Sequence, residues 1–156
     1  MLTNNVKRYI LTTIAGFYSK EGNMSDGFTL GLSSTTPSVD GTNFTEPDAS
    51  TGYARINIHP TGSSSQGPVF PFEWTSTEGA DAYKSVQNKY EIHFNVATSS
   101  WGAAVSYVGI FDNQNRLLAF GNIVNSQGEP ISITVSAGHI PTIAVGQAKI
   151  SLVDIQ

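Results

Sequence analysis

The residues of this 156-residue chain best suited to chemistry are its three histidines, and their spacing gives them no shared task. None of His59, His93 and His139 has a second metal-binding side chain at the spacing of a recognised metal motif. His93 lies on the polar phase of an alternating segment, where a side chain points into solvent. We therefore expect solvated histidines, no metal site and no cofactor.

The serine and acidic residues give no catalytic pattern either. The run at 62–67 misses the G-x-S-x-G nucleophile elbow, a motif that needs a strand-to-helix turn, so it is better read as a turn or linker. Asp40, Glu46 and Asp48 share one loop and carry the oxygen ligands that calcium takes, but the EF-hand pattern is absent. We expect solvated loop acids and a protein that is not an enzyme.

Composition argues against two classes of partner. Eight basic and twelve acidic residues leave a net charge of −4, without a basic run that could hold a phosphate backbone. No stretch approaches the ~18 apolar residues that a membrane-spanning helix needs. Cysteine is absent, which removes disulfides and thiolate chemistry. We expect neither a nucleic-acid nor a membrane partner.

The elements that must position these residues begin with one helix, predicted over residues 4–18. Its apolar residues recur at intervals of four, four and three, which places them on one helical face. They are Val6, Ile10, Ile14 and Phe17. This face either packs on the rest of the fold or docks into another subunit, so the four residues are our predicted assembly interface.

The remaining chain is typical of short strands separated by Gly, Pro and Asn turns. The predicted strands cover residues 28–32, 53–58, 90–94, 107–111, 117–121, 131–135 and 150–155. The strands at 107–111 and 117–121 should form a hairpin, because a short polar turn joins them. We predict a single domain over 1–156: an all-β, antiparallel, jelly-roll-like β-sandwich over 28–156 with one short N-terminal α-helix.

A polar insertion near residues 60–88 contains an aromatic patch made by Phe70, Phe72 and Trp74. Nearby prolines make this patch a poor central strand but an acceptable edge strand. The rings could stack on a sugar, which would make a host surface glycan a partner, or they could fill the core or a subunit interface. Both interpretations remain open at this point.

Two ordered groups of motifs resemble a known family. They are LGLSSTTP at 30–37 with GYAR at 52–55, and WG at 101–102 with YVGIFD at 107–112 and LLAFG at 117–121. In this order they resemble the small bacteriophage structural proteins commonly called tail-fibre or head-fibre proteins. The resemblance covers roughly residues 5–55 and 95–137, and it brings no catalytic residues.

The resemblance implies a non-enzymatic virion component, assembled in the host cytoplasm, that contacts other virion proteins of the tail or the capsid. We expect a tail-fibre or fibre-base subunit that forms a homo-oligomer, with a trimer as the first hypothesis. The alternatives are a capsid decoration or head-fibre protein, and a receptor-binding or carbohydrate-binding module that uses the aromatic patch.

The motifs also lead to physical predictions. Tyr53 and Arg55 fall on one strand face, so Arg55 should pair with a loop acid such as Glu46 and hold the long loop down. Gly109 inside an apolar strand predicts a close backbone approach or a bulge. Trp101 should cover the core at the start of a strand, with Gly102 making the adjacent turn.

Overall fold

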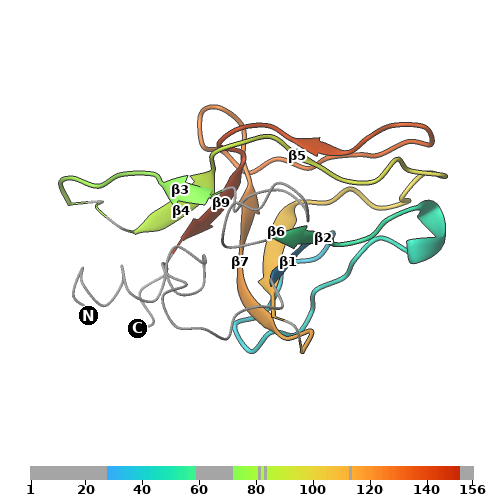
Figure 1. Ribbon diagram of the computed structural model, residues 1–156, viewed down its shortest axis with the longest axis horizontal. Coiled ribbons are helices and arrows are strands. Elements are labelled where there is room, and N and C mark those ends of the chain that lie inside the picture. The colour runs from blue at the N-terminus through green and yellow to red at the C-terminus, as the bar shows by residue number, and fades with distance from the viewer. Residues whose placement is uncertain (1–27, 59–71, 81, 83, 113, 152–156) are drawn as a thin grey trace.

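The computed structural model describes residues 28–58, 72–80, 82, 84–112 and 114–151, and within them the fold is nearly all β (Figure 1). The strands are β1 Phe28–Ser33, β2 Ile56–Ile58, β3 Phe72–Trp74, β4 Ser85–Asn88, β5 Ile92–His93, β6 Tyr107–Phe111, β7 Leu117–Ile123, β8 Thr142–Ile143 and β9 Ala148–Ser151. A single 3-10 turn in these residues, η1, spans Ala49–Thr51. The predicted all-β antiparallel class is confirmed.

The strands form a curled seven-stranded sheet and a two-stranded ribbon. The sheet order is β2-β1-β6-β7-β9-β4-β3, and β5 pairs with β8 in the ribbon. Figure 1 shows the ribbon along the upper side, with the β3–β4 pair at one end and the η1 loop at the other. The jelly-roll form and the single domain stay predictions. The helix predicted over 4–18, with Val6, Ile10, Ile14 and Phe17, lies outside the described residues.

The core lies on one face of the sheet, because apolar residues alternate along its central strands. Leu30 and Leu32 of β1 face inward with Val108 and Ile110 of β6, and all four are at most 1% exposed. Ile143 from the ribbon is equally buried and belongs to the same hydrophobic cluster. The ribbon therefore covers part of the face that the curled sheet presents inward. None of the helices in the described part of the chain is long and apolar enough to cross a membrane.

The predicted hairpin is confirmed, because β6 and β7 pair antiparallel with a register shift between Ile110 and Phe111. The strand predicted at 131–135 is wrong, since this segment makes only a single bridge, from Ile133 to Val105. Its backbone splits between two partners: the Ile131 amide donates to the Ile123 carbonyl, whereas Ile133 bonds to Val105. A continuous ladder needs a single partner strand, and this segment has none.

The predicted polar insertion contains β4, which sequence alternation did not reveal. Asn88 at its end is fully buried, and its amide nitrogen donates to the carbonyls of Tyr90 and Ala144, both at 2.8 Å. Its amide oxygen accepts the Ala148 backbone N–H at 2.8 Å. These bonds satisfy the hydrogen-bonding groups of the buried Asn88 side chain. An asparagine, which in the sequence suggests a loop, therefore connects the end of β4 to the start of β9.

The aromatic segment forms β3, at the edge of the sheet as predicted. The backbones of Phe72 and Trp74 pair with those of Asn88 and Val86. The side chains of Phe72 and Trp74, and the whole of Phe70, lie outside the described structure. Their predicted role as a binding patch therefore stays a prediction.

Candidate functional site

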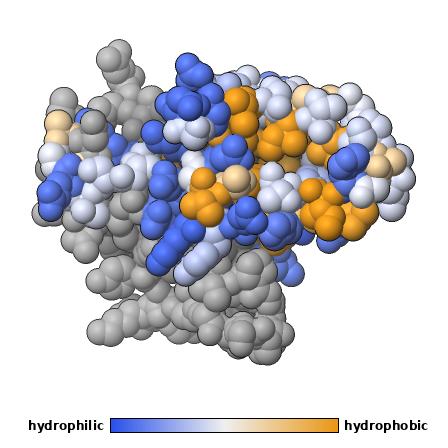
Figure 2. Space-filling model, turned by 90° about the horizontal axis from the view of Figure 1, so that it is seen from above, coloured by the Kyte–Doolittle hydropathy of each residue, from blue (hydrophilic) through white to orange (hydrophobic). Residues whose placement is uncertain are grey.

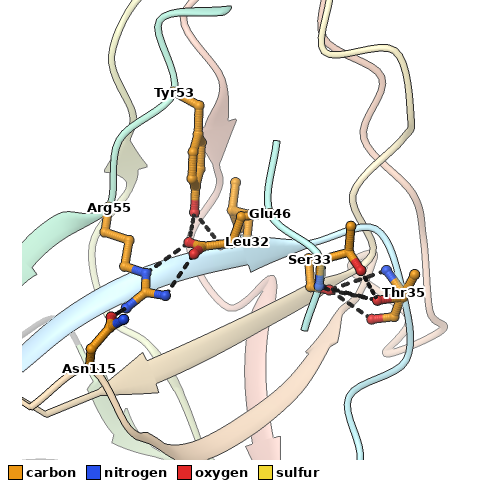
Figure 3. Close-up of polar contacts among 8 residues, drawn as sticks. Leu32, Ser33, Thr35, Glu46, Tyr53, Arg55 and Asn115 are labelled. Atoms are coloured by element: carbon orange, nitrogen blue, oxygen red, sulfur yellow. Dashed lines mark hydrogen bonds and ion pairs between the residues drawn. The ribbon is translucent and has the colours of Figure 1, made fainter. Parts of the chain in front are cut away.

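The outer face of the sheet is closed by the long loop between β1 and β2, which the Glu46 carboxylate fastens (Figure 3). Arg55 donates from Nε to Glu46 Oε1 at 2.8 Å and from Nη2 to Oε2 at 2.6 Å. The predicted ion pair is therefore present, in the bidentate form that gives such pairs their strength. The side chains of Arg55 and Glu46 are only 20% and 24% exposed, so solvent screens the pair less than it would screen a surface pair.

Tyr53 connects this pair to the core. Its hydroxyl donates to Glu46 Oε1 at 2.6 Å and accepts the Leu32 backbone N–H at 2.8 Å. Burial, reinforced by the hydrogen bond to Glu46, raises the pKa of the Tyr53 phenol, which stays protonated as donor. The strand β2 begins only at Ile56 rather than at the predicted residue 53, and the Leu32 N–H bonds to the Tyr53 hydroxyl.

Arg55 also reaches the β6–β7 turn. Its Nη1 donates to Asn115 Oδ1, and its guanidinium carbon lies 3.4 Å from the centroid of the Phe111 ring. Arginine stacks on aromatic faces in this way because its planar cation meets the negative face of the ring. We call Glu46, Tyr53, Arg55 and Asn115 the latch.

Two glycines make room for the closed face. Gly31 and Gly109 are direct cross-strand neighbours. A Cβ at Gly31 would lie 2.7 Å from Glu46 Oε1, and one at Gly109 would lie 2.5 Å from a ring carbon of Phe44. The close backbone approach predicted at Gly109 is wrong, because the approaching groups are the side chains of Phe44 and Leu117. An irregularity in the β6–β7 pairing does follow one residue later, between Ile110 and Phe111.

The other end of the loop is held by hydrogen bonds. Ser33 Oγ accepts the Thr45 N–H at 2.9 Å, and Thr35 Oγ1 donates to the Asn43 carbonyl at 2.6 Å. Asp40 accepts from both the amide and the hydroxyl of Thr42, and these bonds hold the pKa of its carboxyl below the usual value. With these contacts the loop forms a defined cover over the sheet.

The acidic loop residues do not converge. Asp48 caps η1 by accepting the Ser50 N–H at 2.7 Å, Asp40 bonds within its own turn, and Glu46 is bound by Arg55. Across the described residues, three or more His, Cys, Asp or Glu side chains nowhere gather into a group that could hold a metal ion. Each acid therefore has a local structural use.

The end of the molecule that carries η1 is built from three loops that bond to one another. Thr98 N donates to the Thr51 carbonyl at 2.8 Å, and Ala97 N donates to the His139 carbonyl at 2.9 Å. Gly52 has a φ of +85°, and a Cβ there would lie 2.7 Å from the Val96 carbonyl oxygen. A glycine is thus required where the η1 loop meets the β5 segment.

Trp101 covers the core beneath these loops, as predicted. It is 6% exposed and meets the Tyr53 ring edge to face, with 5.3 Å between centroids. Gly102 follows with a φ of +77°, which makes the predicted turn. Tyr53 stacks on Phe94 at 6.1 Å, so one side chain joins the latch, the core and the ribbon segment.

A second surface is open. Large apolar side chains that are more than one-third exposed occur at six described positions: Val39, Tyr90, Val96, Leu118, Ile140 and Val145. Four of them flank the β5–β8 ribbon: Tyr90, Val96, Ile140 and Val145. We call these four the ribbon patch. Figure 2 looks down on this side of the molecule and shows hydrophobic residues spread along its surface with polar residues between them.

The histidines fall where solvent reaches them. His93 is exposed on the ribbon, with Nδ1 3.1 Å from Thr142 Oγ1 and Nε2 3.5 Å from Glu91 Oε2. His139 is exposed in the loop at the end of the ribbon, whereas His59 lies outside the described residues. The structure does not bring His93 and His139 into a common site.

The described residues thus form a curled antiparallel sheet with one face latched shut and with exposed apolar side chains that flank the ribbon. Comparison with known protein families identifies the family to which the chain belongs. Residues 17–151 match the family described as Podophage GP4 fiber I protein gp80. The chain belongs to this family, so it is a structural protein of a bacteriophage fibre, as the sequence motifs predicted. No curated protein matches the chain.

Proposed function

We propose that the protein is a non-enzymatic subunit of the fibre or of its base, which acts by binding copies of itself and other virion proteins. Family membership supports the placement in a fibre. The single observation that carries the assembly role is the ribbon patch. A trimer is the stoichiometry we propose, and assembly takes place in the host cytoplasm before the subunit joins the virion.

The ribbon patch is the observation that supports a protein interface, because its four exposed apolar residues all flank one two-stranded ribbon, with polar residues between them. Exposed apolar residues of one region can mark interaction sites. Val96 and Ile140 are 50% and 54% exposed, and each adjoins a buried residue, Ala97 and Pro141. The backbone beneath them is fixed by hydrogen bonds, so a partner would meet side chains that are already held in place.

A second copy of the chain is the occupant that this surface fits. On the ribbon, Glu91 Oε2 and His93 Nε2 lie 3.5 Å apart, and both side chains are more than half exposed. Two copies that approach through this face would therefore bring their apolar groups together, while solvent still reaches the Glu91 carboxylates. In a closed ring such as a trimer, only residues beside the symmetry axis meet their own copies, so we propose that the ribbon patch lies next to that axis.

The mass in solution, measured by light scattering after size exclusion, tests this proposal. We expect the wild-type protein to be a trimer and Ile140→Asp to be a monomer with an unchanged circular-dichroism spectrum. Val39→Asp is the matched control, because Val39 is 99% exposed but lies in the loop between β1 and β2. A trimeric Ile140→Asp protein, or a monomeric wild type, would contradict the proposal.

Two alternatives differ in location and partner. A capsid decoration or head-fibre role would place the chain on the head, which antibody labelling of intact virions would reveal. A carbohydrate-binding role would use Phe70, Phe72 and Trp74, for which the position of β3 at the sheet edge is the supporting observation.

The interface predicted on the 4–18 segment also remains a proposal, and the same light-scattering measurement on Ile10→Asp tests it.

A further inference from the structure

A hollow of about 290 Å³ lies on the outer face of the sheet over β7 and β9, away from both the latch and the ribbon. Phe120 and Asn122 from β7 line it together with Lys149 and Ser151 from β9. Their chain neighbours Ile123, Ala148 and Ile150 are buried on the core side, so alternation directs these four residues outward, and Gly121 and Val124 also border the hollow. The loop after β7 adds Gly128 at the rim.

The polar groups of this hollow are uncommitted. Lys149 forms no ion pair, and the side chains of Asn122 and Ser151 no hydrogen bond, with any residue that the structure describes. Asn122 and Lys149 are direct cross-strand partners, which puts an amide and an ammonium side by side. Phe120 is partly exposed beside them and offers a ring to the same space.

We propose that this hollow binds one unit of an acidic carbohydrate, a sugar ring that carries a carboxylate. The apolar C–H face of a sugar packs on an aromatic ring, which Phe120 supplies. The Lys149 ammonium pairs with the carboxylate, and Asn122 and Ser151 hydrogen-bond to ring hydroxyls. Ligand pockets usually measure roughly 300–1,000 Å³, so the hollow accommodates a single ring rather than an extended chain.

The composition of the hollow separates this ligand from other classes. A nucleic acid would need several cations along its phosphates, whereas the hollow has one cation and the whole chain carries a charge of −4. Phe120 and Val124 give the hollow an apolar side, but an amide, an ammonium and a hydroxyl also line it, and a lipid tail would leave these polar groups without partners. The site is independent of the proposed assembly role, because the ribbon patch lies on different strands.

Saturation-transfer NMR on the full-length protein tests the proposal. The probes are the methyl glycosides of glucuronic acid, galacturonic acid and N-acetylneuraminic acid, with methyl glucoside and methyl galactoside as neutral counterparts. We expect saturation of at least one acidic glycoside and weaker saturation of the neutral ones. Lys149→Gln should weaken the binding about fivefold and Phe120→Ala about tenfold.

Two controls keep the outcome clear. Lys89→Gln removes an exposed lysine from another part of the molecule and should leave binding unchanged. Phe120→Leu keeps an apolar side chain but removes the flat ring, so it tests the stacking of the sugar on Phe120 if Phe120→Ala does not fold. The proposal is wrong if none of the acidic glycosides receives saturation, or if Lys149→Gln binds them as the wild type does. Equal competition by sodium acetate would reveal a bare anion site and would also overturn it.

Discussion

The two outer surfaces of this protein contrast in how they treat their apolar groups. Over β1 and β6, the loop carrying Phe44 and Glu46 covers the sheet, and Phe111 is left only 4% exposed. Over the β5–β8 ribbon no described segment provides such a cover, and Ile140 and Val145 are more than half exposed. Exposed apolar groups beside the ribbon are the kind of surface that a partner covers, which is why the proposed assembly role is placed there.

The difference also concerns polar chemistry. The covered face keeps a carboxylate, a guanidinium and a phenol in mutual contact, each with its hydrogen bonds satisfied. On the ribbon, His93 contacts Thr142 Oγ1 at 3.1 Å and Glu91 at 3.5 Å, and the side chains of His93 and Glu91 are both well exposed. Changes to the latch should therefore alter folding stability, whereas changes to the ribbon patch should alter association.

The largest effect on stability should come from Glu46→Ala. It leaves Arg55 and the Tyr53 hydroxyl without their acceptor in a mostly buried position, and we expect a loss of about 2–3 kcal/mol in the free energy of unfolding. Chemical denaturation measures this loss. The control is Arg116→Ala, which removes a 69% exposed arginine from its i,i+4 pair with Asp112 and should change stability far less, because Asp112 keeps its backbone hydrogen bonds. Similar losses in both variants would show that the latch does not fasten the loop.

A smaller effect is expected from Tyr53→Phe. This change keeps the ring contacts with Phe94 and Trp101 but removes the acceptor of the Leu32 N–H, at a cost of about 1–2 kcal/mol. Thermal unfolding measures this loss, and an unchanged near-ultraviolet circular-dichroism spectrum would show that the ring packing is kept. A variant as stable as the wild type would mean that water replaces the hydroxyl.

The smallest effect is a pH dependence carried by the same residue. The folded protein holds the pKa of Tyr53 above its ordinary value near 10, so the unfolded chain loses this proton first as pH rises. The stability that Tyr53 contributes is therefore complete below pH 10 and declines above it. Tyr53→Phe should show a shallower decline between pH 9.5 and about 11, and equal slopes in the two proteins would contradict this.

Sequence reasoning reached the parts of this structure that depend on local pattern. The β6–β7 hairpin followed from alternation and a polar turn, and the pairing of Arg55 with Glu46 followed from two residues on one strand face. The edge position of β3 followed from its prolines. In each case the determining interaction lies within the segment or one loop away.

The parts that were missed depend on distant partners. The strand predicted at 131–135 has the right alternation, but no single strand lies beside it for its whole length. Asn115 joins the closed face through Arg55, which lies 60 residues away in the sequence, and Phe44 joins it through the Phe111 ring. Sequence spacing reveals neither contact. The ribbon patch could be found only from exposure, since Val96 and Ile140 look like ordinary core residues in the sequence.

Cysteine crosslinking tests the central claim most directly, because the chain has no cysteine of its own. Ile140→Cys and Val39→Cys each introduce one thiol at an exposed position, on the open and the closed side respectively. A short bis-maleimide added to the assembled protein should join Ile140→Cys subunits into covalent dimers and leave Val39→Cys as single chains. Crosslinks through Val39→Cys with none through Ile140→Cys would contradict the claim that the ribbon is the face between subunits.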